Sequence, residues 1–206
     1  MKKQFIRRLF LVVLGQVIIS AGITLMLFIN LGADPLGVFH TGVANILNIS
    51  FAKAILLENL FVVIIVYFID KKYINIATII TLFVVSLTTG YFDSLYNFIF
   101  PSEMSFIFRV VVLLLACFIL AVGLNFYVLP KLGVGAMDIP VEMLVDKKGY
   151  IYQRVKVLTD LMFLVACYFL GGVVGIGTVI SAFAVGPFIQ ITRKFMSEPI
   201  KKFIES

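Results

Sequence analysis

Long apolar runs separated by short polar links are the main pattern of the chain. A helix needs about 20 predominantly apolar residues to cross the hydrocarbon core of a bilayer. Six runs approach or exceed this length, and we expect each to be a transmembrane helix: residues 9–29, 51–69, 74–98, 106–129, 155–170 and 173–191. The pattern therefore predicts an all-α membrane protein with six transmembrane helices.

The same pattern occurs twice, with an offset of 101 residues. Leu31-Gly32 recurs as Leu132-Gly133 (132 minus 31), Gly22 as Gly123, and Tyr67-Phe68 as Tyr168-Phe169. The apolar runs around these matches keep the register, which indicates a duplication. We assign residues 1–103 to a first three-helix repeat and residues 104–206 to a second, and expect both to form one integrated membrane domain.

The positions of lysine and arginine predict the orientation in the membrane. With the N-terminus inside, all of the 17 basic residues except Lys53 and Arg109 fall on the cytoplasmic side. Both termini are therefore expected in the cytoplasm. A unit with three spans inserts upside down the second time, so the repeats should be inverted. Many secondary transporters have this architecture, with a site near the membrane midplane, although channels and non-transporting membrane proteins share it.

A short apolar segment follows the first span of each repeat. In the first repeat, Asp34-Pro35 is typical of a helix start and predicts a short helix over residues 35–47 that ends at Asn48. In the second, a helix is expected from Pro140 to Lys148, ending at Gly149.

These short helices allow two arrangements. They either dip into the protein from opposite faces, which would aim two helix N-termini at a central site, or lie on the membrane surface. We expect the first arrangement. Asp34 and Asp138 precede the two helices, and we interpret them as caps, with direct contact to a substrate as the alternative.

Ionisable groups inside the predicted spans point to a site. Glu58 lies in the second span and Asp160 in the fifth, and the repeat register sets Glu58-Asn59 opposite Thr159-Asp160. A carboxylate at membrane depth costs a few kcal/mol, so such groups usually face the bundle or a cavity. The alternative is that both are hydrated near an interface, beside a lysine of the same helix. If transport is proton-coupled, Glu58 or Asp160 would carry the proton.

Two further residues complete the candidate site. His40 is the only histidine, which excludes catalytic or metal sites that need two. Thr178 follows a glycine-rich turn and either lines a pathway or bonds to its own helix backbone. No nucleophile–base pair, metal cluster or phosphate loop is visible in the sequence. We therefore expect no enzyme activity, no cofactor and no metal.

Composition agrees with a protein whose main partner is the lipid bilayer. Apolar residues make up 62% and charged residues 14%, against roughly 45–50% and about 25% in soluble proteins, and the mean hydropathy is +1.12. The net charge of +6 follows from the orientation signal and does not indicate nucleic acid. Cys117 and Cys167 lie in apolar runs and do not suggest a disulfide framework.

The motifs resemble those of a known family. They are Gly22, Leu31-Gly32-Ala33-Asp34-Pro35, Gly42, Leu132-Gly133-Val134-Gly135, Asp138, Gly171-Gly172, Gly175-Ile176-Gly177-Thr178 and Gly186-Pro187. Over nearly the whole chain they are similar to the YczE/YyaS/YitT group of bacterial membrane proteins, especially its short YczE-like branch. Gly37 departs from the family motif, in which an acidic or polar residue is expected at this position, as at Asp138 in the second repeat. The resemblance implies a bacterial inner-membrane protein, of a group often labelled as transporters but mostly without an assigned function.

Two functions follow from these patterns. The first is a small transporter or channel for a small solute, an anion being one option, with a site at the repeat interface. Its candidate residues are Glu58, Asn59, Asp160, Thr159, Asp34, Asp138, His40 and Thr178. The alternative is a non-transporting membrane subunit or scaffold, similar to the substrate-binding component of an uptake complex. That function would need a membrane partner protein, and either function is compatible with a homo-oligomer.

Overall fold

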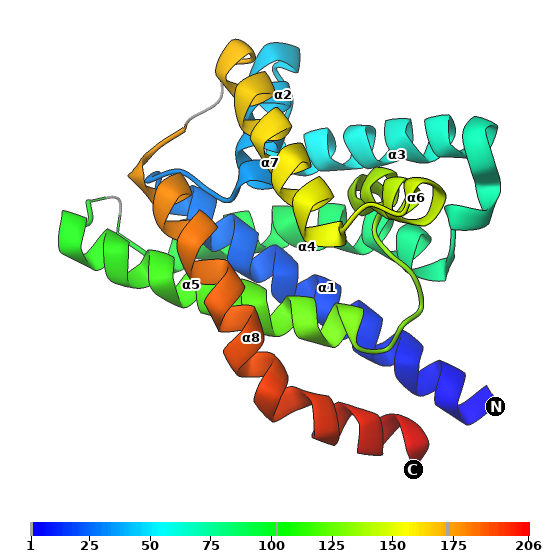
Figure 1. The fold of residues 1–206 in the computed structure, drawn as a ribbon. Coiled ribbons are helices and arrows are strands. Elements are labelled where there is room, and N and C mark those ends of the chain that lie inside the picture. The colour runs from blue at the N-terminus through cyan, green and yellow to red at the C-terminus, as the bar shows by residue number, and fades with distance from the viewer. Residues whose placement is uncertain (1, 102, 172–173) are drawn as a thin grey trace.

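A computed structural model describes residues 2–101, 103–171 and 174–206, and every regular element in these ranges is helical. The α-helices are α1 (Lys2–Phe28), α2 (Pro35–Leu47), α3 (Phe51–Asp70), α4 (Ile76–Ile99), α5 (Phe106–Val128), α6 (Ile139–Lys148), α7 (Tyr152–Phe169) and α8 (Ile176–Glu205) (Figure 1). Short 3-10 turns, Lys71–Tyr73 and Ala136–Asp138, follow α3 and precede α6. Gly172 and Val173 of the glycine-rich turn lie outside the described residues.

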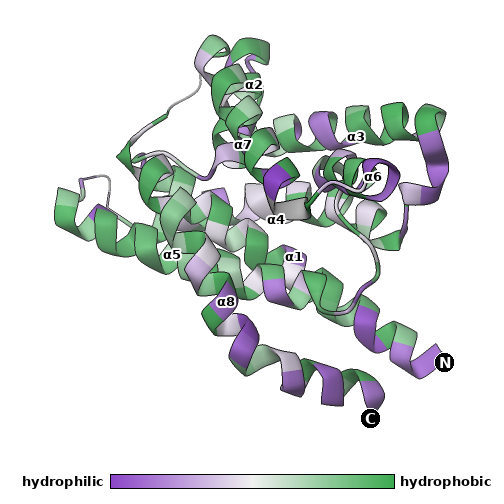
Figure 2. Cartoon of the chain, viewed as in Figure 1, coloured by the Kyte–Doolittle hydropathy of each residue, from purple (hydrophilic) through white to green (hydrophobic). Residues whose placement is uncertain are grey.

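The expectation of an all-α membrane protein is confirmed. Among the described residues, α1, α3, α4, α5 and α8 are long and apolar enough to cross a membrane. Figure 2 shows apolar residues along these helices, with polar ones gathered at both chain ends and on α6. Large apolar side chains such as Phe61, Phe68 and Phe183 are exposed, as expected of a surface that faces lipid. α7 is not among these candidate spans, since three of its 18 residues are charged.

The first and last helices extend beyond the predicted spans. α1 begins at Lys2 and has 27 residues, and α8 continues to Glu205 and has 30. The continuous apolar runs end where the basic residues begin, but lysine, arginine and glutamate are good helix formers and continue the helix. At about 1.5 Å per residue, both helices exceed a hydrocarbon core of about 30 Å. Pro187 and Pro199 lie inside α8, which is bent (Figure 1); proline removes a helical hydrogen bond and so favours a bend.

Both short helices end as predicted. α2 stops at Asn48 (φ 52°) and α6 at Gly149 (φ 67°), each with a left-handed backbone. The expected capping is wrong in its detail. Asp34 and Asp138 occupy the N-cap positions, but neither side chain makes a capping hydrogen bond. Asp138 instead accepts a hydrogen bond from Lys156, so a tertiary partner replaces the local one.

The centre of the bundle is a close crossing of α1 and α5. A Cβ atom added to Gly15 would lie 2.6 Å from the backbone nitrogen of Tyr127, and one added to Gly123 would lie 2.7 Å from that of Ile19. The two backbones therefore touch, as small residues allow in membrane helices. α4 packs along α1, α8 packs along α5, and α2 packs against α3 and α7.

Contacts between these helices fix their directions. α4 runs parallel to α1, since Gln16 contacts Thr81 and Ala21 contacts Tyr96. α8 runs parallel to α5: the Phe118 and Phe188 rings meet edge-on, and Asn125 contacts Thr192. α1 and α8 are antiparallel, because Arg7 contacts Ser206 and Leu31 contacts Gly177. Both chain termini consequently lie at the same end of the molecule (Figure 1).

Candidate functional site

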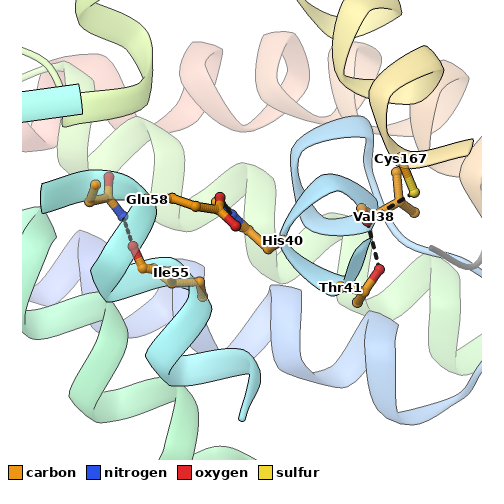
Figure 3. A network of polar contacts seen from close by, with 7 residues as sticks. Val38, His40, Thr41, Ile55, Glu58 and Cys167 are labelled. Carbon is orange, nitrogen blue, oxygen red and sulfur yellow. Dashed lines mark hydrogen bonds and ion pairs between the residues drawn. The ribbon is translucent and has the colours of Figure 1, made fainter. Parts of the chain in front are cut away.

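His40 and Glu58 form a sealed pair between α2 and α3. His40 Nδ1 contacts Glu58 Oε2 (Figure 3), and the two residues are only 4% and 8% exposed. The second carboxyl oxygen of Glu58, Oε1, is buried and has no hydrogen-bond partner among the described residues. Burying a polar atom without a partner is costly, so this oxygen requires an explanation. We refer to these two residues as the His–Glu pair.

Aromatic and backbone contacts hold the His–Glu pair in place. The ring of Phe51 meets the His40 ring edge-on at 5.9 Å between centroids. The Val38 carbonyl accepts hydrogen bonds from Cys167 Sγ at 3.0 Å and from Thr41 Oγ1 at 2.6 Å (Figure 3). Because Cys167 belongs to α7, the first of these bonds fixes the helix that carries His40 against the second repeat.

Lys156 joins two carboxylates on the other side of the site. Its Nζ lies 3.1 Å from Asp160 Oδ1 and 3.4 Å from Asp138 Oδ1. Asp160 is on the same helix, four residues further, and Asp138 precedes α6. All three side chains are about 30% exposed, the lysine 31% and each aspartate 30%. We refer to them as the Lys–Asp cluster.

Asp34 lies between the His–Glu pair and the Lys–Asp cluster. Burial raises the pKa of its carboxyl above the ordinary value of 3.8, and the nearby charges of His40 and Lys156, together with the backbone amide of Gly37, oppose this rise only in part. Asp160 is also near enough to raise the pKa of Asp34 further. Asp34 Oδ1 is buried without a hydrogen-bond partner among the described residues. The site therefore contains a second carboxyl oxygen that lacks a partner.

The remaining predicted residues are satisfied by their own helices. Asn59 Nδ2 donates to the Ile55 carbonyl at 2.8 Å, and Thr159 Oγ1 donates to the Val155 carbonyl at 2.6 Å. Thr178 Oγ1 accepts a hydrogen bond from the Gly175 amide at the start of α8. These three hydroxyl and amide groups have structural roles in this arrangement. The structure thus brings together Asp34, His40 and Glu58 with Asp138 and Asp160, and leaves the other three aside.

The sequence places a lysine of the same helix beside Asp160, and its spacing of four residues indicates the helical ion pair that Lys156 forms. The sequence interpretation overlooked one feature. A buried polar row on α1, made of Gln16, Ser20 and Thr24, was not singled out. Gln16 Nε2 donates to Thr81 Oγ1 at 2.8 Å, and Thr88 Oγ1 donates to Ser20 Oγ at 2.7 Å. This row joins α1 to α4, and its period of four in an apolar helix was the available signal.

Two hollows lie along the described residues away from this site. One, of about 480 Å³, is lined by Glu103, Met104, Ser105 and Arg109 between α4 and α5. The other, of about 330 Å³, is lined by apolar residues of α1, α5 and α8. Neither is lined by the His–Glu pair or the Lys–Asp cluster.

Comparisons with known proteins identify the family. The chain belongs to a family described as "Family of unknown function (DUF6198)", which matches residues 6–194. It is 22% identical over 193 residues, 93% of this chain and 88% of the relative, to the "Uncharacterized membrane protein YczE" of Bacillus subtilis (strain 168). No solved structure matches the chain. The resemblance to the YczE-like group is confirmed, and neither description states a substrate.

Proposed function

We propose that this member of a family of unknown function is a small transporter, whose site is formed by Asp34, the His–Glu pair and the Lys–Asp cluster. One observation carries the proposal: Glu58 Oε1 is buried in a membrane protein without a protein partner. Leaving such an atom unsatisfied costs about 1–3 kcal/mol, and more for a charged group. Ionisable groups in this situation usually mark the path of an ion, a proton or a substrate.

The backbone supports the inverted repeats expected for such a transporter. Left-handed residues recur at the offset of 101 found in the sequence: Asn30 with Lys131, Gly32 with Gly133, and Asn48 with Gly149. Their φ angles are 51° and 56°, 100° and 110°, and 52° and 67°. Two of the three pairs differ in residue type. The agreement therefore lies in the fold and not only in the sequence.

The two proposed repeats also make equivalent contacts with each other: the link after the first helix of each repeat contacts the last helix of the other. The link after α1 lies on the start of α8, where the Gly177 amide donates to the Leu31 carbonyl at 2.7 Å. The link after α5 lies on the start of α4, where Thr78 Oγ1 donates to the Val134 carbonyl at 2.7 Å. Each repeat therefore supports the last helix of the other. A pseudo-two-fold axis accounts for this exchange, and secondary transporters bind solute beside such an axis.

Helix directions favour a sixth span. α5 ends beside the start of α1, whereas α8 begins beside the end of α1, so the chain must return across the bundle between α5 and α8. Of the described helices between them, only α7 has sufficient length: its 18 residues extend about 27 Å. Leu158, Leu161 and Val165 on one side of α7 are exposed and would face lipid, while Lys156 and Asp160 turn toward the site.

This topology leads to a test of orientation. Six spans and the distribution of basic residues together put both termini in the cytoplasm, as expected for an inner-membrane protein. Cysteines introduced by Glu103→Cys and Gly171→Cys should react with a membrane-impermeant maleimide on intact spheroplasts. A cysteine introduced by Lys71→Cys should react only after the membrane is opened. Protection of the Gly171→Cys variant in intact cells would contradict the sixth span.

The charge of the site bears on the solute. Asp34, Glu58, Asp138 and Asp160 supply four carboxyl groups, against the two bases His40 and Lys156. This balance favours a cation or a proton over the anion that the sequence allowed. A small cation and a proton would compete for the same carboxyl oxygens, which is a simple basis for exchange transport. In that scheme Glu58 is the main proton carrier, and Asp160 is the more accessible second carboxylate.

The proposal is tested by transport currents on solid-supported membranes. Proteoliposomes would be exposed to a panel of small amines, amino acids, inorganic cations and monocarboxylates. We expect at least one cationic solute to give a current that depends on the proton gradient. The variants Glu58→Gln and Asp160→Asn should abolish this dependence, while Asp93→Asn, at an exposed position of α4, should behave like the parent. If the Glu58→Gln and Asp160→Asn variants both give the same proton-dependent currents as the parent, these residues do not form the transport site.

A non-transporting subunit is the second candidate. One observation favours it: Ala182 and Gly186, one helical turn apart on α8, are both exposed, and small residues favour contacts between membrane helices. In that case the parent protein would give no current with any solute in the panel. It would also co-purify with a membrane protein partner, and an Ala182→Phe/Gly186→Phe variant would lose that partner.

A further inference from the structure

The second hollow is an apolar groove at the end of the molecule where both chain termini lie. α1 contributes Phe10 and Leu14 to its walls, α5 contributes Phe126, and α8 contributes Phe195, Pro199 and Phe203. Every lining residue is apolar, and the volume of about 330 Å³ falls within the range of small-ligand sites. Pro199, inside α8, forms part of one wall. The groove therefore joins the first helix of the chain to the last.

Basic residues are concentrated on the same segments of α1 and α8 that line this groove. The chain carries Lys2, Lys3, Arg7 and Arg8 on α1, and Arg193, Lys194, Lys201 and Lys202 on α8. The acids on the same stretches are Glu198 and Glu205. The charge excess is therefore strongly positive at the point where an apolar groove opens.

Two neighbouring arginines of α1, close in sequence to the groove residue Phe10, have guanidinium nitrogens available for a further hydrogen bond. Arg7 Nη1 donates to Ser206 Oγ at 2.9 Å, and its guanidinium lies 5.5 Å from the Phe203 ring, so both of its partners are neutral. Arg8 Nε is buried without a hydrogen-bond partner among the described residues. Within the part of the chain that the structure describes, neither arginine makes an ion pair with a carboxylate. Guanidinium groups bind phosphate oxygens through paired hydrogen bonds.

We propose that the groove binds an anionic phospholipid. An acyl chain lies along the apolar walls, and the phosphate accepts hydrogen bonds from Arg7 and Arg8. The combination of an apolar wall and unneutralised guanidinium groups suits a lipid, since a soluble anion would leave the walls bare and a neutral lipid would leave the arginines unpaired. Basic pockets between membrane helices bind anionic headgroups in this way. Bound there, the lipid would connect α1 to the C-terminal part of α8.

The absence of tryptophan from the chain permits a direct test. The variant Phe195→Trp introduces a single indole into the groove wall, and Phe183→Trp introduces one on the exposed face of the same helix as a control. Each variant would be reconstituted in mixed phosphatidylcholine and phosphatidylglycerol vesicles, with bromine on the chains of one lipid or the other. We expect brominated phosphatidylglycerol to quench the Phe195→Trp variant several-fold more effectively than brominated phosphatidylcholine. The Phe183→Trp control should show no such preference.

Charge variants separate a built site from general attraction. Adding Arg7→Gln/Arg8→Gln to the Phe195→Trp variant should remove the preference for the anionic lipid. Adding Lys2→Gln/Lys3→Gln, which removes the same charge from the same end of the chain, should preserve it. Equal quenching by the two lipids, or equal loss in both charge variants, would overturn the proposal. Displacement of the quenching lipid by inorganic phosphate alone would show an anion site without lipid and would also overturn it.

Discussion

The two halves of the site are built alike but differ in access to solvent. In each half an ion pair spans 18 residues and joins the short helical segment to the following long helix: His40 with Glu58, and Asp138 with Lys156. The positions of base and acid are reversed between the halves. The short segment carries the base, His40, in the first half and the acid, Asp138, in the second. Side-chain exposure is 5% and 9% in the first pair but 30% and 31% in the second.

This contrast indicates that one scaffold serves two purposes. The His–Glu pair is buried, so water screens the interaction between its two side chains little. The Lys–Asp cluster is open to solvent, which screens its charges. Asp34 adds a further asymmetry, since Gly135 stands at its place in the second repeat. In the proposed transport scheme, the first half would hold the proton and the second would exchange with solvent.

The largest expected effect comes from breaking the sealed pair. His40→Ala removes the partner of Glu58 and leaves a carboxylate buried alone, which should cost about 3–5 kcal/mol of stability. Replacing both residues, as His40→Leu/Glu58→Leu, should cost much less, because apolar side chains need no partner. Thermal unfolding of the purified protein in detergent, followed by circular dichroism, measures both. A double variant as unstable as the single one would mean that packing, not charge, holds α2 against α3.

The sequence predicted the fold where local signals determine it. Pro35, Asn48 and Gly149 act on their own backbone, and the helices they bound were predicted to within about one residue. The end of α8 was not predicted, because residues 192–205 are not a continuous apolar run. Their apolar residues recur at the spacing of an amphipathic helix, and Ile200 and Ile204 are buried. A continuous apolar run marks the part of a helix in lipid and not the whole helix.

The site was predicted as a set of residues but not as a set of pairs. Glu58 and His40 were each identified as unusual, yet their contact depends on how α2 packs against α3, which no local pattern encodes. Asp34 and Asp138 were interpreted as caps from their position before proline. The structure leaves both capping bonds unmade, because Lys156 engages Asp138 and the buried Asp34 Oδ1 finds no partner. Tertiary contacts override local signals at these two positions of the proposed site.

An intermediate effect is expected at Asp34. Because burial raises the pKa of its carboxyl, the unfolded chain releases this proton more readily than the folded one. The folded state should therefore lose stability as the pH rises above the ordinary aspartate pKa of 3.8. Asp34→Asn should flatten this dependence and raise stability at neutral pH by roughly 1 kcal/mol, the low end of the cost of a buried polar atom without a partner.

Unfolding curves at several pH values would check this expectation, with the exposed Asp93→Asn variant as the control. The steepness of the pH dependence should fall only in the Asp34→Asn protein. An Asp34→Asn protein that is less stable than the parent at neutral pH would instead show that the Asp34 carboxylate is stabilised by the neighbouring charges of His40 and Lys156.

The smallest effect is expected at Lys156, and it sharpens the contrast between the two halves. Lys156→Met keeps the length of the side chain and removes its charge. Since about a third of the lysine and of each aspartate is exposed, water can replace much of the lost attraction, and the loss of stability should be about 0–1 kcal/mol. Lys148→Met, at the exposed end of α6, is the matched control. If Lys156→Met destabilises the protein as much as His40→Ala does, the Lys–Asp cluster is sealed in the folded protein. The two halves would then share one function, and the division between a proton-holding half and a solvent-exchanging half would fail.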